Sequence, residues 1–181
     1  MLEVEVKIRT HINEIRDKLV SIGFVRECSE YELDTYYNSE LLDLKNEDKA
    51  LRIRENRNLD SGKTVYILNY KGPKLDDSTM TRSETEFVIP SYEAGENLLT
   101  GIGYNPAGRV EKTRISYKKD GCTCCLDQVT GLGEFLEIEI MADESEYDIA
   151  LGKINELLVK LGLSMNDTIR TSYLCMLQEM R

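Results

Sequence analysis

The first strand-like stretch of the chain constrains its fold most strongly. Charged residues alternate with valines there: Glu3, Glu5 and Lys7 share one side, and Val4 and Val6 share the other. This period of two is typical of a β-strand, whose successive side chains point to opposite faces. Same-face neighbours lie about 7 Å apart along a strand, so the two carboxylates repel each other unless a cation lies between them. Taken alone, the motif is also compatible with the solvated face of an edge strand.

Like charges recur at the same spacing in four other segments with strand-like sequence. The pairs are Arg52 and Arg54, Glu84 and Glu86, Lys112 and Arg114, and Glu137 and Glu139. Like charges held on one face of a sheet are unfavourable by themselves. They become compatible when several pairs face a common interior in which acids, bases and a charged ligand balance. A closed antiparallel barrel with a polar lumen provides such an interior, and its apolar residues then point outward under covering helices.

Periodicity and turn residues predict the order of the elements. Strands are predicted over residues 1–10, 24–37, 50–55, 65–71, 82–89, 109–118, 122–129 and 135–141, helices over 12–22, 91–101, 151–162 and 167–180, and polar loops over 38–48 and 74–79. No linker or shift in composition interrupts the 181 residues, so the chain predicts a single domain over residues 1–181. The predicted fold is α+β, a closed eight-stranded antiparallel β-barrel with surrounding helices.

Charge and hydropathy exclude several classes of partner. The net charge of −10 disfavours nucleic acid, whose phosphates bind lysine and arginine. The basic residues are spread through strands rather than gathered in a run, which suits one small polyanion in a pocket. No apolar run approaches the roughly 20 residues that span a bilayer, and no signal-peptide pattern is present, so we expect a cytoplasmic protein without membrane association.

The cysteines and the histidine carry little predicted chemistry. The five cysteines have no second metal-binding cluster beside them, and we expect them to be reduced and to pack as small hydrophobic residues. His11 is the only histidine and is expected at the surface. Catalytic arrangements that need histidine are therefore disfavoured, and the absence of a GxxxxGK[ST] run excludes a P-loop.

An ordered set of motifs resembles a known family. The motifs are Glu3-x-Glu5-x-Lys7, Asp34-Thr-Tyr36, Leu51-Arg-Ile-Arg54, Tyr70-Lys-Gly-Pro73, Arg82-x-Glu84-x-Glu86, Lys112-Thr-Arg114, Leu126-Asp127 and Gly131-Leu-Gly-x-Phe-x-Glu-Ile-Glu139. They follow the order seen in the CYTH superfamily, which contains class IV adenylyl cyclases and thiamine triphosphatases and has the triphosphate tunnel fold. The segment from Leu126 to Glu139 and the late Ser172-Tyr173-x-x-x-Leu177 look closest to the class IV cyclase branch.

The resemblance implies roles for individual residues. The implied ligands of Mg2+ or Mn2+ are Glu3, Glu5, Asp127, Glu137 and Glu139. The implied triphosphate-binding residues are Lys7, Arg52, Arg54, Lys71, Lys112, Arg114 and Arg170, and the implied catalytic residues are Lys7, Arg54, Lys112 and Asp127. Glu84, Glu86 and Arg82 could be structural ion pairs or ligands, and Asp34 and Tyr36 could pack or form hydrogen bonds near the tunnel mouth.

Three functions are compatible with this inventory. The first is a class IV adenylyl cyclase that converts ATP to cyclic AMP and pyrophosphate. The second is a triphosphatase of the same fold, acting on thiamine triphosphate, inorganic triphosphate or a nucleotide. The third is a silent polyphosphate-binding module, which is disfavoured because it needs the cations but not all of the carboxylates. The family also makes a homodimer plausible.

Overall fold

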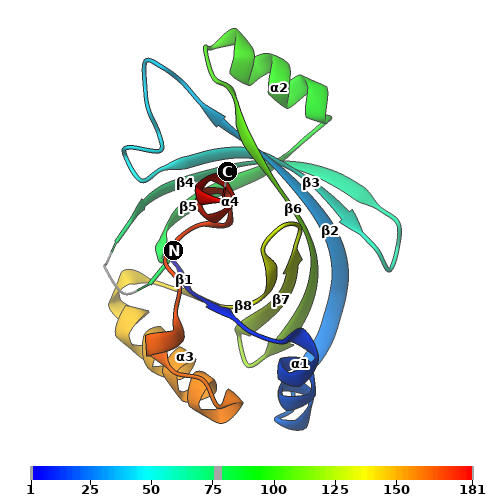
Figure 1. The fold of residues 1–181 in the computed structure, drawn as a ribbon, viewed down its shortest axis with the longest axis vertical. Coiled ribbons are helices and arrows are strands. Elements are labelled where there is room, and N and C mark those ends of the chain that lie inside the picture. Colours follow the sequence, from blue (N-terminus) through cyan, green and yellow to red (C-terminus); the bar gives the residue numbers. More distant parts are fainter. Residues whose placement is uncertain (1, 76–78, 181) are drawn as a thin grey trace.

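Eight antiparallel strands close into a barrel within the described part of the chain (Figure 1). The computed structural model describes residues 2–75 and 79–180. The strands are β1 (Leu2–Arg9), β2 (Val25–Asn38), β3 (Ala50–Asn58), β4 (Thr64–Lys74), β5 (Arg82–Ile89), β6 (Asn105–Lys119), β7 (Cys122–Val129) and β8 (Gly133–Ala142). Around the barrel their order is β1-β5-β4-β3-β2-β6-β7-β8. The predicted barrel is confirmed.

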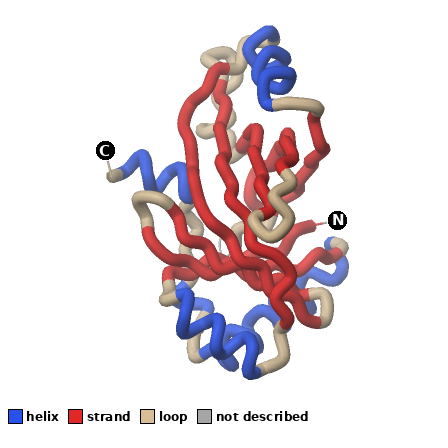
Figure 2. The backbone as a smooth tube through the Cα atoms, turned by 90° about the vertical axis from the view of Figure 1, so that its right-hand side faces the viewer, coloured by secondary structure: helices blue, strands red, loops and turns tan. Residues whose placement is uncertain are grey.

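Helices pack against the outside of the barrel wall and at one end of its lumen (Figure 2). They are α1 (Ile12–Ser21), α2 (Tyr92–Gly101), α3 (Tyr147–Leu161) and α4 (Tyr173–Glu179), with short 3-10 turns at Glu144–Glu146 and Met165–Asp167. In Figure 1, α1 and α3 lie below the barrel, α2 lies above it, and α4 lies in the middle of the ring of strands. In the described ranges, no helix is long and apolar enough to cross a membrane.

The main apolar core lies outside the barrel wall, between the strands and two helices. Val4, Val6 and Ile138 pack there with Leu19 of α1 and Leu158 of α3, and none of these side chains is more than 1% exposed. Each such burial stabilises the fold by about 1.5–3 kcal/mol. The expectation that the apolar alternates point outward under helices is confirmed, and their charged neighbours in sequence therefore face the lumen.

Local sequence signals set the turns and the helix ends. Asp120 and Gly121 have φ values of 49° and 78° and join β6 to β7 in a two-residue turn, as the Asp-Gly sequence predicts. The hydroxyl of Ser91 accepts a hydrogen bond of 3.1 Å from the backbone N–H of Ala94 and caps α2. The predicted loop at 74–79 is only partly described: Lys74 belongs to β4, and residues 76–78 lie outside the described residues.

The C-terminal segment differs from its predicted structure. A helix was expected over 167–180, but residues 168–172 are not helical and α4 begins only at Tyr173. Thr168 bridges to Ile8, and the N–H of Ile169 donates to the carbonyl of Lys7 over 2.7 Å. The free edge of β1 takes this segment because β1 pairs with β5 at one position alone, Glu3 with Arg82. Pairing with β1 satisfies backbone groups that a longer helix would leave exposed at that edge.

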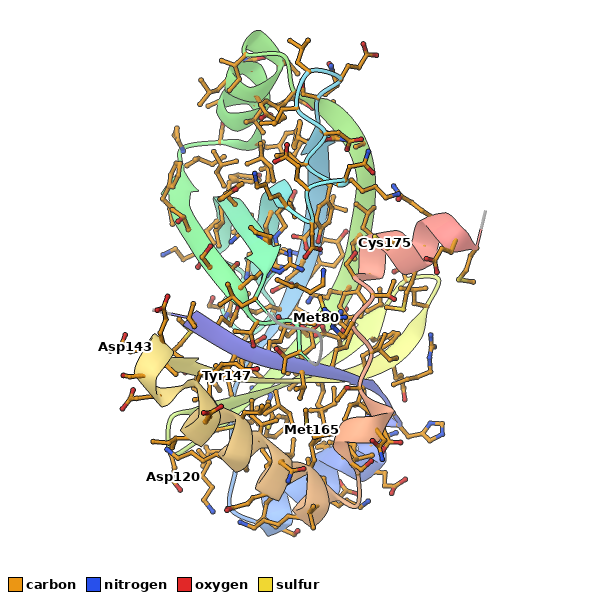
Figure 3. The ribbon with its side chains drawn as sticks, turned by 90° about the vertical axis from the view of Figure 1, so that its left-hand side faces the viewer. Met80, Asp120, Asp143, Tyr147, Met165 and Cys175 are labelled. Atoms are coloured by element: carbon orange, nitrogen blue, oxygen red, sulfur yellow. The ribbon has the colours of Figure 1, made fainter. Side chains whose placement is uncertain are left out.

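Helix α4 closes one end of the lumen over a second apolar cluster. Tyr173 packs there with Phe135, Val110 and Val129. The approach to the facing strand is close, because a Cβ atom at Gly108 would lie 2.6 Å from Cδ1 of Leu174 and would force that side chain to move. In Figure 3, the labelled Cys175 marks α4, above the centre of the barrel. The labelled Asp143, Tyr147 and Met165 lie in the lower layer of helices.

Candidate active site

The lumen holds a cavity of about 420 Å³, a size that accommodates a small organic ligand. Charged side chains from most strands line it. Those from the predicted site are Glu3, Glu5, Lys7, Arg52, Arg54, Lys71, Lys112, Arg114, Glu137, Glu139 and Arg170. The structure therefore brings together every predicted site residue except Asp127, which lies behind the cavity surface and is 0% exposed. Which of these side chains bind a ligand or a metal stays a prediction.

Oppositely charged side chains in contact line and back one side of the cavity, and we term this set the paired wall. Its members are Glu32, Asp34, Arg52, Arg54, Lys112, Arg114, Asp127 and Glu137, from β2, β3, β6, β7 and β8. Asp34 receives two hydrogen bonds from Arg54, of 2.7 and 2.9 Å, and one of 3.0 Å from Arg52. Such a two-pronged contact holds the guanidinium in one orientation.

Glu32 joins the two halves of the paired wall. Its carboxylate lies 2.9 Å from Arg54 and 3.2 Å from Lys112. Burial alone would raise the pKa of Glu32, but Arg54 and Lys112 lower that pKa to about 2. The pKa of Asp34 is likewise held well below its ordinary value by Arg52 and Arg54, against the effect of burial. Both carboxylates are therefore ionised throughout the physiological range.

Asp127 is the most completely engaged carboxylate. Arg114 donates to it through Nε and Nη2, both over 2.7 Å, and Lys112 donates over 2.9 Å. The hydroxyl of Tyr173 adds a hydrogen bond of 3.1 Å. Four donors leave little acceptor capacity for another partner. The implied metal-ligand role of Asp127 stays untested, and this geometry favours a carboxylate that orients Arg114 and Lys112.

Glu137 stands where the paired wall meets β1. It contacts Arg114, and it lies 3.7 Å from Lys7 and 4.0 Å from Lys112. Burial would raise the pKa of Glu137, but Lys112 and Arg114 hold it well below its ordinary value. Glu137 is therefore a charged carboxylate with cations on several sides.

The adjoining part of the cavity lining, which we term the carboxylate wall, consists of Glu3, Glu5 and Glu139, the last of which lies 3.4 Å from Arg114. Glu5 of β1 and Glu139 of β8 are direct cross-strand neighbours. Burial raises the pKa of Glu139 to about 7, with Glu5 and Glu137 adding to the effect. Burial and a hydrogen bond with Glu84 raise the pKa of Glu3 to about 9, and burial and Glu137 raise that of Glu5. These carboxylates have too few nearby cations to offset their loss of water.

A hard divalent cation suits this donor set. Carboxylate oxygens are its preferred ligands, and a carboxylate with a raised pKa gains most from a new positive neighbour. Within residues 2–75 and 79–180, no three acidic, cysteine or histidine side chains already converge on one point that could hold a metal. Metal binding at Glu3, Glu5 and Glu139 would therefore require side-chain rotation.

Arg52 retains an unused hydrogen-bond donor. It donates through Nη1 to Asp34 and, over 3.4 Å, to the hydroxyl of Tyr36, while its buried Nε has no hydrogen-bond partner. A buried N–H group of a charged side chain is costly to leave unpaired. Arg52 therefore carries an uncompensated donor behind the cavity lining.

The residues whose roles were left open occupy distinct positions. Arg82 is buried and donates to the backbone carbonyls of Met80, Asp48 and Gly72, which favours a structural role. Glu84 lies 2.9 Å from Lys71, which also lies 3.5 Å from Glu3. The structural alternative therefore fits Glu84 as well.

The remaining predicted positions lie at the cavity edge or at the surface. Glu86 is exposed and accepts a hydrogen bond of 3.2 Å from Asn69. Arg170 lines the cavity and donates to the carbonyl of Thr79 over 3.3 Å. The side chain of His11 is 89% exposed, as expected. The cysteines are free, and Cys124 packs in the main core, also as expected.

Sequence reasoning assigned no role to Glu32 or Asn69, and it missed the charged contacts of Tyr173. Glu32 and Asp34 form an i, i+2 acidic pair in a strand, which is the same signal that identified the other pairs. Asn69, which donates to Glu84 and Glu86, carries no such signal because it is uncharged. Tyr173 lay in a predicted helix and was given no site role, yet its ring and hydroxyl contact charged groups.

The closed barrel with a buried, mixed-charge cavity defines a protein of the triphosphate tunnel class. The family model described as the CYTH domain matches residues 1–173, and the chain belongs to the CYTH family.

Relatives and solved structures agree with this assignment. The chain is 34% identical over 176 residues to a Methanocaldococcus jannaschii protein named "Putative adenylate cyclase MJ0240", with 96% of this chain and 97% of that protein covered. It is 29% identical over 143 residues to adenylate cyclase CyaB of Aeromonas hydrophila, covering 78% of this chain and 70% of that one. The structure of the PH1819 protein from Pyrococcus horikoshii superposes with a TM-score of 0.90 at 36% identity and 99% coverage of both chains.

Proposed function

We propose that the protein is a metal-dependent enzyme that converts ATP to cyclic AMP and pyrophosphate. The observation that carries the proposal is a set of six basic side chains, Lys7, Arg52, Arg54, Lys71, Lys112 and Arg114, facing one cavity in a chain of net charge −10. Two relatives that cover most of the chain carry the name adenylate cyclase. The alternatives of Mg2+ and Mn2+ remain open.

The basic side chains bind and orient the triphosphate in this proposal. Arg52 lines the cavity, and Arg54 is held in a fixed orientation by Asp34. Guanidinium groups match phosphate oxygens as planar forks, whereas Lys7 and Lys112 act as point charges. Positioning and charge stabilisation of this kind account for most of the catalysis of phosphoryl transfer.

The carboxylate wall would hold the divalent cation. Glu3, Glu5 and Glu139 supply hard oxygen donors, and Glu137 and Asp127 complete the predicted set. When bound, the cation supplies charge neutralisation on the phosphate chain and lowers the pKa of a coordinated hydroxyl. The ribose 3′-oxygen then bonds to the α-phosphorus, the bond from that phosphorus to the bridging oxygen breaks, and the hydroxyl proton passes to solvent. No histidine lines the cavity among the described residues, so the rate is expected to rise with pH over the alkaline range.

Triphosphate hydrolysis uses the same cavity. The basic side chains would bind phosphate groups in either reaction. A water molecule that attacks the terminal phosphorus would meet the same cations as a ribose hydroxyl that attacks the α-phosphorus. The choice depends on which phosphorus faces the nucleophile, and not on the identity of the charged residues.

Product analysis separates these reactions. Purified protein is incubated with ATP and either Mg2+ or Mn2+, and the products are resolved by chromatography. Cyclic AMP with pyrophosphate is the expected result. ADP with orthophosphate, or rapid release of phosphate from tripolyphosphate or thiamine triphosphate, would assign the protein to the triphosphatases. Tight binding without any product would identify a silent polyphosphate-binding module.

A further inference from the structure

Tyr173 reaches the cavity from the C-terminal segment rather than from a barrel strand. Thr168 and Ile169 pair with the edge of β1, and Ser172 caps α4 through its hydroxyl, 3.2 Å from the N–H of Cys175. Tyr173 is the first residue of α4 and is 7% exposed. The same segment holds Lys7 from two sides, because Ile169 donates to the carbonyl of Lys7 and Lys7 Nζ donates to the carbonyl of Thr171 over 3.2 Å.

Two ammonium groups lie over the ring of Tyr173. Lys7 Nζ is 4.4 Å from the ring centroid and Lys112 Nζ is 5.3 Å from it. Both distances fall within the roughly 6 Å at which an aromatic face attracts a cation. The ring is itself held at both ends: its hydroxyl donates to Asp127, and Phe135 packs against it edge-to-face with centroids 5.0 Å apart.

An aromatic face differs from a carboxylate as a partner for lysine. A carboxylate cancels the charge of the ammonium and repels an incoming phosphate, whereas a ring attracts the ammonium without adding a net negative charge. Lys7 has a single carboxylate at ion-pair distance among the described residues, Glu137 at 3.7 Å. The ring of Tyr173 is therefore a strong determinant of where this ammonium stands.

We propose that Tyr173 is a positioning residue whose ring holds the ammonium group of Lys7, and helps Asp127 and Glu32 to hold that of Lys112, at the cavity wall, where both meet the phosphate chain of the ligand. The identity of that ligand rests on the proposed function; the ring contact does not. The C-terminal segment thus completes the cation set of the barrel instead of only closing its end.

A binding experiment tests the functional part. Affinity for tripolyphosphate is measured by calorimetry for the wild type, Tyr173→Phe and Tyr173→Leu. Tyr173→Phe keeps the ring and should bind within about threefold of the wild type, whereas Tyr173→Leu should lose about tenfold. The matched control is Tyr31→Leu, because Tyr31 also has a cation over its ring, Arg57 at 4.9 Å, and also donates to a carboxylate, Glu111, but lies outside the cavity. Tyr31→Leu should bind as the wild type does.

A spectroscopic experiment tests the contact without any ligand. Ring currents move the signals of protons above an aromatic face upfield, so the Cε protons of Lys7 and Lys112 should resonate upfield of the other lysines. The shift should persist in Tyr173→Phe and disappear in Tyr173→Leu. If Tyr173→Leu fails to fold, pentafluorophenylalanine at position 173 keeps the ring and reverses the sign of its quadrupole, and the tenfold loss should then appear with that variant.

The outcomes separate this inference from the proposed function. Ordinary lysine shifts in the wild type would overturn the inference, as would folded Tyr173→Leu that binds tripolyphosphate with wild-type affinity. Equal losses in Tyr173→Phe and Tyr173→Leu would assign the effect to the hydroxyl and also overturn it. If the wild type itself does not bind tripolyphosphate, the proposed function fails, and the spectroscopic arm alone then decides whether the ring holds the two ammonium groups.

Discussion

The two walls of the cavity carry the same acidic residue types in opposite electrostatic states. On the paired wall, lysine and arginine lower the pKa values of Glu32, Asp34 and Glu137 despite burial. On the carboxylate wall, burial dominates and raises the pKa of Glu139 to about 7 and that of Glu3 to about 9. Burial is common to both walls, so the cross-strand neighbours make the difference.

This difference separates a part of the site whose charges are compensated without a ligand from a part whose charges are not. Charges on the paired wall are compensated by oppositely charged neighbours, which hold arginine and lysine in place without a ligand. Charges on the carboxylate wall are poorly compensated until a cation arrives. Substitutions on the first wall should therefore cost stability, whereas substitutions on the second should cost metal binding.

Removing Arg114 should produce the largest effect on stability. Arg114→Ala leaves Asp127, which is fully buried, without its two-pronged partner and weakens the compensation of Glu137 and Glu139. Breaking a buried pair from one side costs about 3–5 kcal/mol. Urea unfolding monitored by circular dichroism measures the loss. Lys118→Ala is the control, since Lys118 lies on the same strand and pairs with Glu27 at the surface over 2.7 Å. Equal stability of the two variants would remove the distinction between lumen and surface pairs.

Glu139→Gln should raise the stability of the fold in the absence of divalent metal. A folded-state pKa of about 7 against an ordinary 4.5 means that the folded state binds this proton more tightly. Stability is therefore lost as the pH rises from about 4.5 to about 7, and the loss persists above that range. At pH 8 the neutral glutamine should recover stability on the order of 3 kcal/mol. Unfolding at pH 8 in a chelator checks this, and a destabilised Glu139→Gln would place Glu139 on the paired wall.

Glu32→Gln should lower stability by about 2 kcal/mol at neutral pH. Its two cations keep other carboxylate partners, Arg54 with Asp34 and Lys112 with Asp127, so the loss is smaller than for Arg114. The folded-state pKa of about 2 lies below the ordinary 4.5, so this stabilisation is present above pH 4.5 and fades as the pH falls toward 2. The stability difference between the wild type and Glu32→Gln should close over that interval. Glu27→Gln, the surface acid of the same strand, should show no such pH dependence.

The sequence predicted the existence of both walls, but not their division. Alternation in the segment from Glu3 to Lys7 and the i, i+2 pairs correctly placed charged side chains inside a barrel. The division depends on register: Glu5 stands opposite Glu139, whereas Arg114 stands opposite Asp127. Register across a barrel follows from twist, bulges and turn lengths summed over several strands, and these cannot be read from spacing within one strand.

The C-terminal segment shows a second limit. Its apolar residues suggested a helix from residue 167, and the local pattern contained no sign that the edge of β1 would be free to pair with residues 168–169. The edge of β1 is free there because β1 and β5 pair at a single position. Tertiary context therefore converted predicted helix into non-helical chain and placed Tyr173 against Lys7.

Addition of Mg2+ should produce the smallest of these changes in stability. It should also distinguish the roles of the two walls most clearly. At a free Mg2+ concentration of ten times its Kd, a ligand that binds only the folded state stabilises it by about 1.4 kcal/mol. The wild type should gain this increment at pH 8, where a cation offsets the repulsion between Glu5 and Glu139. Glu139→Gln should gain much less, because it lacks one anionic oxygen donor. Glu32→Gln should gain as much as the wild type, because its substitution leaves the three acids of the carboxylate wall intact. Thermal unfolding across an Mg2+ titration measures all three proteins under the same conditions. An increment lost equally in Glu32→Gln and Glu139→Gln would mean that the walls do not act separately, and an increment retained in Glu139→Gln would move the metal away from the carboxylate wall.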